Sequence, residues 1–247
     1  MKKLILICMI VVAILFASGC VTVGINSSGG LNSVQGTGSV VSQDFNVADF
    51  NGLSIFGNFV VVYQYSATNA VTVVMQENLF EYLEVSVTNT NLNIEASRGF
   101  NTTNANRPRV YISAPYLQYA RFDGAINAED WDTITTQRLH IVAAGAANAT
   151  ISIDVDEFEI LVAGAGDFDV SGNATDTNIT VTGAGTINAT TLQTANAIIS
   201  VAGAGNAYIA VSDTLDVTIA GVGNVRYVGD PHISQSIAGF GSVRRMD

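Results

Sequence analysis

A glycine motif that returns about every nineteen residues restricts the possible folds of this chain more than any other feature. In each copy a small residue precedes the first glycine, and the first glycines of six copies are Gly145, Gly164, Gly183, Gly203, Gly221 and Gly239. Successive copies lie 19, 19, 20, 18 and 18 residues apart, and a weaker copy surrounds Gly124. A unit this short cannot bury an apolar face by itself, so the units are expected to stack.

The residues around each glycine alternate between apolar and polar, which is the periodicity of a β-strand. The positions four residues before the first glycines hold Ile141, Ile160, Ile179, Ile199, Val217 and Gln235. The intervening positions carry Ser, Thr, Asp, Asn and Ala. We therefore predict an all-β fold in which residues 121–247 form a parallel β-helix, or solenoid, of about six to seven coils of about 19 residues. Equivalent side chains should stack at the strand spacing of about 4.8 Å.

One outward column of turn-forming residues supports this register. Three residues after the first glycines stand Asn127, Asn148, Asp167, Thr186, Asn206, Asn224 and Ser242. Such side chains can hydrogen-bond to neighbouring coils, so we interpret the column as a structural ladder rather than a binding strip. In the last copy Gln235 and Arg245 occupy positions that are apolar in earlier copies, as expected at a solenoid end.

Residues 44–120 alternate in the same way but lack the glycine motif. They predict a less regular N-terminal β lobe, joined to the solenoid between Pro115 and Gly124. Residues 44–247 are expected to form one continuous unit.

The N-terminus has the features of an export signal. Lys2 and Lys3 precede the apolar run 4–16, and residues 1–19 end in small residues before Cys20. The segment 17–20, Ala-Ser-Gly-Cys, resembles a bacterial lipoprotein lipobox, in which the cysteine receives a diacylglyceryl group, although Ala17 stands where Leu is usual. An ordinary signal peptide with an incidental cysteine is the alternative. Residues 20–43, rich in Gly and Ser, predict a flexible tether.

The side chains available for chemistry are few. Acidic residues outnumber basic ones by 21 to 10, which argues against a nucleic-acid partner. His140 and His232 are the two histidines, and no Gly-x-Ser-x-Gly segment surrounds a serine. We therefore expect no catalytic residue, no cofactor and no zinc site.

An acidic run is the strongest chemical candidate. It consists of Asp154, Asp156, Glu157, Glu159, Asp167 and Asp169. Such carboxylates could hold Ca²⁺ or act on a polysaccharide. In the repeat register Asp167 and Asp169 are interleaved with neutral residues, which favours a solvated structural face. A further outward column places Tyr208 before Arg226 and Arg244 and predicts a cation–π contact.

Several segments outside the repeat resemble one known family. They are 50–55 (FNGLSI), 58–62 (NFVVV), 83–87 (LEVSV), 92–94 (LNI) and 110–117 (VYISAPYL), together with the repeated Gly-Ala-Gly turns. Residues 44–245 resemble the putative auto-transporter adhesin, head GIN domain family. The resemblance implies a β-helix-like fold on an exported protein, with adhesion as the family's label.

These observations lead to one preferred function. We expect a non-enzymatic lipoprotein of the cell envelope, attached through a lipid on Cys20 at the outer membrane or cell surface, whose solenoid serves adhesion or scaffolding. Its partners would be the membrane and a glycan or protein ligand. A polysaccharide-binding or polysaccharide-degrading β-helix that uses residues 154–169 is the alternative.

The lipobox prediction can be tested on the mature protein. Mass spectrometry should find an N-terminus at Cys20 that carries a lipid, because a diacylglyceryl group on the thiol is the product of lipobox processing. A Cys20→Ser variant should lose the lipid and leave the membrane fraction. An unmodified N-terminus at any other residue would contradict the prediction.

Overall fold

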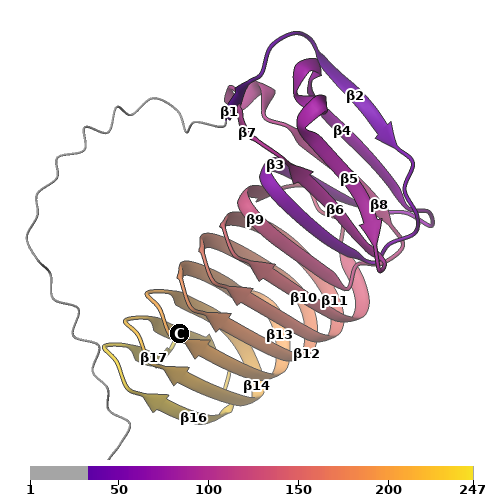
Figure 1. The fold of residues 1–247 in the computed structure, drawn as a ribbon. Helices are drawn as coiled ribbons and strands as arrows, with labels where there is room; N and C mark the ends of the chain where they lie inside the picture. Colours follow the sequence, from indigo (N-terminus) through magenta and orange to yellow (C-terminus); the bar gives the residue numbers. More distant parts are fainter. Residues whose placement is uncertain (1–32, 247) are drawn as a thin grey trace, which may run out of the picture. The chain divides into compact units, whose positions relative to one another are not determined.

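The computed structural model describes residues 33–246, and about 71% of them lie in strands (Figure 1). The predicted signal segment 1–19, Cys20 and residues 21–32 of the predicted tether lie outside this range. Within it, no helix has the length and apolar character required to cross a membrane.

The N-terminal strands are β1 (Ser33–Gln35), β2 (Val40–Phe45), β3 (Gly52–Tyr65), β4 (Ala70–Gln76), β5 (Leu83–Thr88), β6 (Asn91–Ala96), β7 (Gly99–Asn101) and β8 (Arg109–Ala114). Two short 3-10 helices accompany them, η1 (Glu77–Tyr82) and η2 (Asn104–Asn106). The repeat region holds β9 (Tyr119–Ala128), β10 (Ile134–Ala143), β11 (Ala146–Val162), β12 (Ala165–Val181), β13 (Ala184–Val201), β14 (Asn206–Ile219), β15 (Asn224–Val228), β16 (His232–Ile237) and β17 (Ser242–Arg245).

The repeat region is a parallel β-solenoid of about seven turns, as the sequence predicts. Each long strand pairs in parallel with the equivalent strand of the next coil, so that Ile160 lies beside Ile179 and Ile179 beside Ile199. The predicted inward column is therefore confirmed. These isoleucines are fully buried, and apolar side chains from every coil form one continuous core.

The glycines allow the coils to approach closely at their turns. A Cβ at Gly164 would overlap the carbonyl oxygen of Gly145, and a Cβ at Gly183 would overlap that of Gly164. The backbone amide of Ala165 donates to the same carbonyl of Gly145 at 3.0 Å, and the amide of Ala184 donates to Gly164 at 2.9 Å. Only a residue without a side chain leaves room for this turn-to-turn contact.

The solenoid begins earlier than the boundary at residue 121 that the sequence suggests. Strand β3 pairs in parallel with β9 over ten residues, and Gly57 lies opposite Gly124. Gly57 adopts a φ of 140°. The first coil therefore lies within residues 44–120, and it escapes the repeat pattern because Gly57 is followed by Asn58 and Phe59 instead of small residues.

The N-terminal lobe covers this end of the solenoid. Strands β2, β4 and β8 form an antiparallel sheet that continues from β3, and β5 and β6 form a hairpin beside it. Residues 33–35 pair with β7, and residues 40–45 pair with β4, so this part of the predicted tether is strand. Its Gly and Ser content suggests flexibility, but the valines Val40 and Val41 follow the strand pattern and find a partner in β4.

Aromatic packing joins the lobe to the solenoid. The Trp131 ring lies 5.7 Å from the Tyr63 ring and 6.1 Å from the Phe122 ring, and its Nε1 donates to the carbonyl of Val61 at 2.8 Å. The Tyr63 hydroxyl donates to the carbonyl of Ala114 at 3.1 Å. Burial raises the pKa of Tyr63 to about 12, with a smaller contribution from the nearby Asp132 carboxylate.

The opposite end is open to solvent. Gln235 and Arg245 pair with Val217 and Tyr227 of the preceding coil, which confirms their predicted register. All of β16 is exposed. Equivalent positions are apolar in the earlier coils, and polar side chains at this end reduce the apolar surface that the last coil exposes to solvent.

The glycine contact predicts a stability effect. Gly164→Ala should lower the free energy of unfolding by about 2–3 kcal/mol, because the new methyl group forces neighbouring coils apart. Gly99→Ala is the matched control, since its added Cβ meets only Ser33 atoms at ordinary distances of 3.7 Å and beyond. Urea denaturation followed by circular dichroism measures both, and equal stabilities of the two variants would contradict this role of Gly164.

Candidate binding surface

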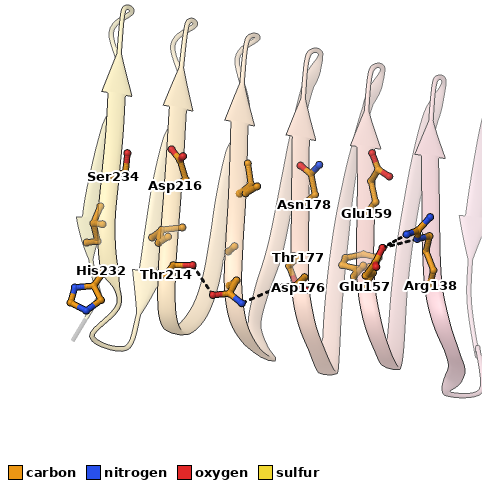
Figure 2. A pocket seen from close by; sticks show the side chains of 16 residues that line it. Arg138, Glu157, Glu159, Asp176, Thr177, Asn178, Thr214, Asp216, His232 and Ser234 are labelled. Carbon is orange, nitrogen blue, oxygen red and sulfur yellow. Dashed lines mark hydrogen bonds and ion pairs between the residues drawn. The ribbon is translucent and has the colours of Figure 1, made fainter.

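A groove of about 830 Å³ runs along one side of the solenoid (Figure 2). Strands β10 to β14 and β16 form this side, which we call the groove wall. Each coil contributes outward side chains in two parallel columns. The first column consists of Arg138, Glu157, Asp176, Asn196, Thr214 and His232. The second consists of Glu159, Asn178, Ile198, Asp216 and Ser234.

The first column is largely bonded to itself. Arg138 Nε donates to Glu157 Oε2 at 2.7 Å. Asn196 Nδ2 donates to Asp176 Oδ1 at 2.9 Å, and the Thr214 hydroxyl donates to Asn196 Oδ1 at 2.7 Å (Figure 2). These contacts alternate charged and neutral groups along the wall and so relieve repulsion between adjacent coils.

The second column is free to contact a ligand. Within residues 33–246 no side-chain hydrogen bond joins its members to one another or to their surroundings. Its centre is apolar, because Ile198 is 57% exposed between Asn178 and Asp216. The wall thus presents amide, carboxylate and hydroxyl groups on both sides of one exposed aliphatic side chain.

A buried polar pair lies beneath the groove. The hydroxyls of Thr177 and Thr194 lie 3.0 Å apart. The Thr194 hydroxyl is also 3.2 Å from the carbonyls of Thr175 and Asn196. Since Thr194 can donate to a carbonyl while it accepts from Thr177, both hydroxyls are satisfied inside an otherwise apolar core.

The acidic run does not form a single site. Glu157 and Glu159 lie on the groove wall. Asp154 and Asp156 line a second depression, while Asp167 and Asp169 line a third. Strand pairing between β11 and β12 is interrupted at Asp156, where the coil bends, and the glycine turn separates Glu159 from Asp167. In the described part of the chain no three acidic, His or Cys side chains are placed to hold a metal ion.

The predicted structural ladder is confirmed on the third side of the coil. The Asp167 amide donates to Asn148 Oδ1 at 3.1 Å, and the Ser242 hydroxyl donates to Asn224 Oδ1 at 2.8 Å. Asn188 Nδ2 donates to Asp169 Oδ1 at 2.9 Å. Asp169 therefore pairs with the next coil through its carboxylate, while Asp167 contributes its backbone amide to the ladder.

Aromatic contacts involve both histidine and arginine. His140 is half-buried, because its ring packs edge-to-face on Tyr119 with ring centres 5.6 Å apart. Tyr208 lies opposite Arg226 as predicted, but the cation–π contact found among residues 33–246 is that of Arg98 over Tyr82, at 5.1 Å.

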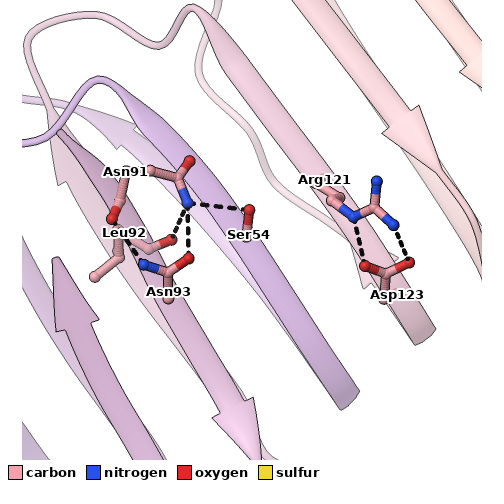
Figure 3. A network of polar contacts seen from close by, with 6 residues as sticks. All are labelled: Ser54, Asn91, Leu92, Asn93, Arg121 and Asp123. Atoms are coloured by element: carbon pink, nitrogen blue, oxygen red, sulfur yellow. Dashed lines mark hydrogen bonds and ion pairs between the residues drawn. The ribbon is translucent and has the colours of Figure 1, made fainter. Parts of the chain in front are cut away.

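The groove wall continues onto the lobe through β9, β3 and β6. Asn91 Nδ2 donates to the Ser54 hydroxyl at 3.0 Å and to Asn93 Oδ1 at 2.8 Å (Figure 3). Arg121 binds Asp123 through two nitrogens, at 2.6 and 3.1 Å. Its hydrogen bonds to Asp123 raise the pKa of the Arg121 guanidinium. These polar groups are engaged with one another.

Comparison with known families identifies the chain. The family described as putative auto-transporter adhesin, head GIN domain, matches residues 49–231. The chain belongs to this family. A comparison with curated proteins found no match.

Solved structures share the fold of this GIN-domain chain. A putative adhesin from Bacteroides fragilis is 22% identical, with a TM-score of 0.80 over 86% of this chain and 100% of the other. A putative adhesin from Parabacteroides distasonis is 24% identical, with a TM-score of 0.66 over 87% and 100%. A putative lipid binding protein from the same species is 21% identical, with a TM-score of 0.68 over 87% and 100%.

The buried threonine pair predicts an asymmetric response. Thr194→Val should destabilise the protein by about 1–3 kcal/mol, because it leaves the Thr177 hydroxyl without its partner. Thr177→Val should cost less, since Thr194 keeps its carbonyl acceptors, and the double variant should recover part of the loss. Thermal and urea unfolding of the three variants provide the measurement, and equal costs for the two single variants would contradict the pairing.

Proposed function

We propose that this GIN-domain protein is a non-enzymatic lipoprotein of the cell envelope that displays its solenoid for adhesion or scaffolding. Membership of a family described as putative adhesins supports this role. The fold shared with structures described as putative adhesins is consistent with it. In this proposal Cys20 carries the lipid, and the segment before Ser33 spans the distance from the membrane surface to the solenoid.

The observation that carries the proposal is the second column of the groove wall. Its Asn178, Asp216 and Ser234 side chains have no internal partner, and they lie in one register on β12, β14 and β16, with Ile198 of β13 between Asn178 and Asp216. The continuous core and the close turns hold these groups at fixed spacing, so a ligand that binds along the wall encounters a surface already organised for contact. Repeated contacts of this kind suit an extended or repetitive ligand.

A polysaccharide ligand is the second candidate. The groove combines Glu159 and Asp216 with the exposed Ile198, and such polar groups around an apolar patch fit the alternating hydroxyl and C–H surfaces of a sugar chain. In this form of the proposal, binding of sugars would use the groove wall, with Glu157 and Glu159 as the members of the acidic run that take part.

The groove wall can be tested with a matched pair of substitutions. The purified protein should be screened against glycans and extracellular matrix proteins, with and without Ca²⁺. Ile198→Arg should weaken binding of the ligand found there by about tenfold or more, because it places a large charged group at the centre of the wall.

Val222→Arg is the control. Val222 is also apolar and is 55% exposed, compared with 57% for Ile198, but it lies at a glycine turn away from the groove. Loss of binding in the Ile198 variant alone would support the proposal. Unchanged binding in both variants, with folding intact, would show that the groove wall is not the adhesive surface.

A further inference from the structure

Two arginines differ from the other cationic side chains of the described chain because they have no interaction partner. Six of its eight arginines have a partner. Arg138, Arg121, Arg109 and Arg245 form ion pairs, Arg107 donates to Asn58 and Ala125, and Arg98 lies over Tyr82. Arg226 and Arg244 form no hydrogen bond, ion pair or ring contact with any other residue in 33–246.

These two arginines are direct neighbours. Arg226 on β15 and Arg244 on β17 are partners in the parallel register, and both are exposed. Adjacent strands are about 4.8 Å apart, and like charges placed opposite each other at this spacing are destabilising. The chain has 21 acidic residues and only 10 basic ones, so a shortage of carboxylates does not explain why this pair has none.

The residues that precede the pair on the same side of the sheet are polar and uncharged. On the same side of the sheet, two residues before each arginine, lie Asn224 and Ser242. Ser242 donates to Asn224, and Asn224 donates one amide hydrogen to Asn206 at 3.3 Å. The second amide hydrogen of Asn224 therefore remains available beside the guanidinium groups. Tyr208 precedes Arg226 in the same column on β14.

We propose that Arg226 and Arg244 form a binding site for the phosphate or sulfate ester groups of an anionic polysaccharide. A guanidinium group donates two parallel hydrogen bonds to such an oxyanion, and one anion between two stacked guanidinium groups removes their mutual repulsion. The adjacent Tyr208 ring offers a surface on which a sugar can pack.

The same wall argues against an anionic bilayer as the ligand. Asp169 lies in the column of the arginines, three coils away on β12, with Asn188 and Tyr208 between them. Asp167 lies beside it in the neighbouring column. A flat bilayer would approach these carboxylates together with the arginines, and membrane recognition of this kind uses clusters of about four to eight basic residues. A narrow polymer can contact the arginines and Tyr208 without reaching across Asn188 to Asp169.

This inference deepens the proposed function, because it names the ligand class that one wall of the solenoid recognises. It rests on the proposed function only for the exposure of the protein to such polymers. The arginine pair lies outside the groove wall, so the two sites can be tested separately.

The test uses the purified protein at constant ionic strength with dextran sulfate, neutral dextran and vesicles of phosphatidylglycerol as probes. Dextran sulfate should bind and neutral dextran should not. Arg226→Gln with Arg244→Gln should weaken dextran sulfate binding by about tenfold or more, since both charge-assisted contacts are lost. The Arg226→Lys, Arg244→Lys variant keeps the positive charge without the planar guanidinium. Its affinity for dextran sulfate should lie between those of the unmodified protein and the double glutamine variant.

A second double variant controls for net charge. Arg98→Gln with Arg109→Gln removes the same charge elsewhere and should bind dextran sulfate like the unmodified protein. Equal weakening in both double variants, with unchanged thermal unfolding, would overturn the site. Binding of phosphatidylglycerol vesicles without binding of dextran sulfate would overturn the polysaccharide assignment.

The outcomes also separate this site from the groove wall. If the Arg226 and Arg244 variant keeps full dextran sulfate binding while Ile198→Arg abolishes adhesion, the arginine site is wrong and the proposed function stands. If the arginine site binds as expected while Ile198→Arg leaves adhesion unchanged, the groove wall fails and the arginine site stands.

Discussion

The close stacking of backbone between successive coils is the constraint on which this structure depends. At each glycine turn a carbonyl of one coil occupies the space that a Cβ of the next coil would need, as at Gly145 and Gly164. This contact keeps neighbouring coils in one register, so that Ile160, Ile179 and Ile199 lie in a continuous core. The fold holds an extended polar surface on a narrow apolar interior, and each coil contributes to both.

The same register arranges the surface side chains in columns, and neighbouring members of a column must avoid repulsion between like charges. Most columns achieve this by internal pairing, as in the sequence Asp176, Asn196, Thr214, where carboxylate, amide and hydroxyl groups share hydrogen bonds. Some outward side chains lack such pairing, among them the second column of the groove wall and the pair Arg226 and Arg244. Because solvent is their only partner in the described chain, a ligand can bind at these positions without displacing internal contacts.

Much of the fold could be predicted from the sequence because the same spacing of apolar and polar residues recurs in each copy of the repeat. A single alternating segment leaves its neighbours unknown, but six copies with apolar residues at equal offsets specify which strands are adjacent and which side faces inward. The first coil does not show this pattern, since Gly57 is followed by a large side chain at Phe59. The composition of residues 33–35 and 40–45 does not predict strands, because it reflects local flexibility, whereas their order comes from pairing with β7 and β4.

The sequence alone determined the strand periodicity, the coil length, the inward columns and the polar end at Gln235 and Arg245, because each follows from spacing along the chain. The tertiary structure decided which charged groups meet. Residues 154–169 are contiguous in the sequence but fall on three sides of the solenoid, since the chain bends near Asp156 and turns after Val162. Arg226 and Arg244 are 18 residues apart in the sequence but become neighbours on adjacent strands. No carboxylate of the described chain pairs with either of them, which only the folded structure shows.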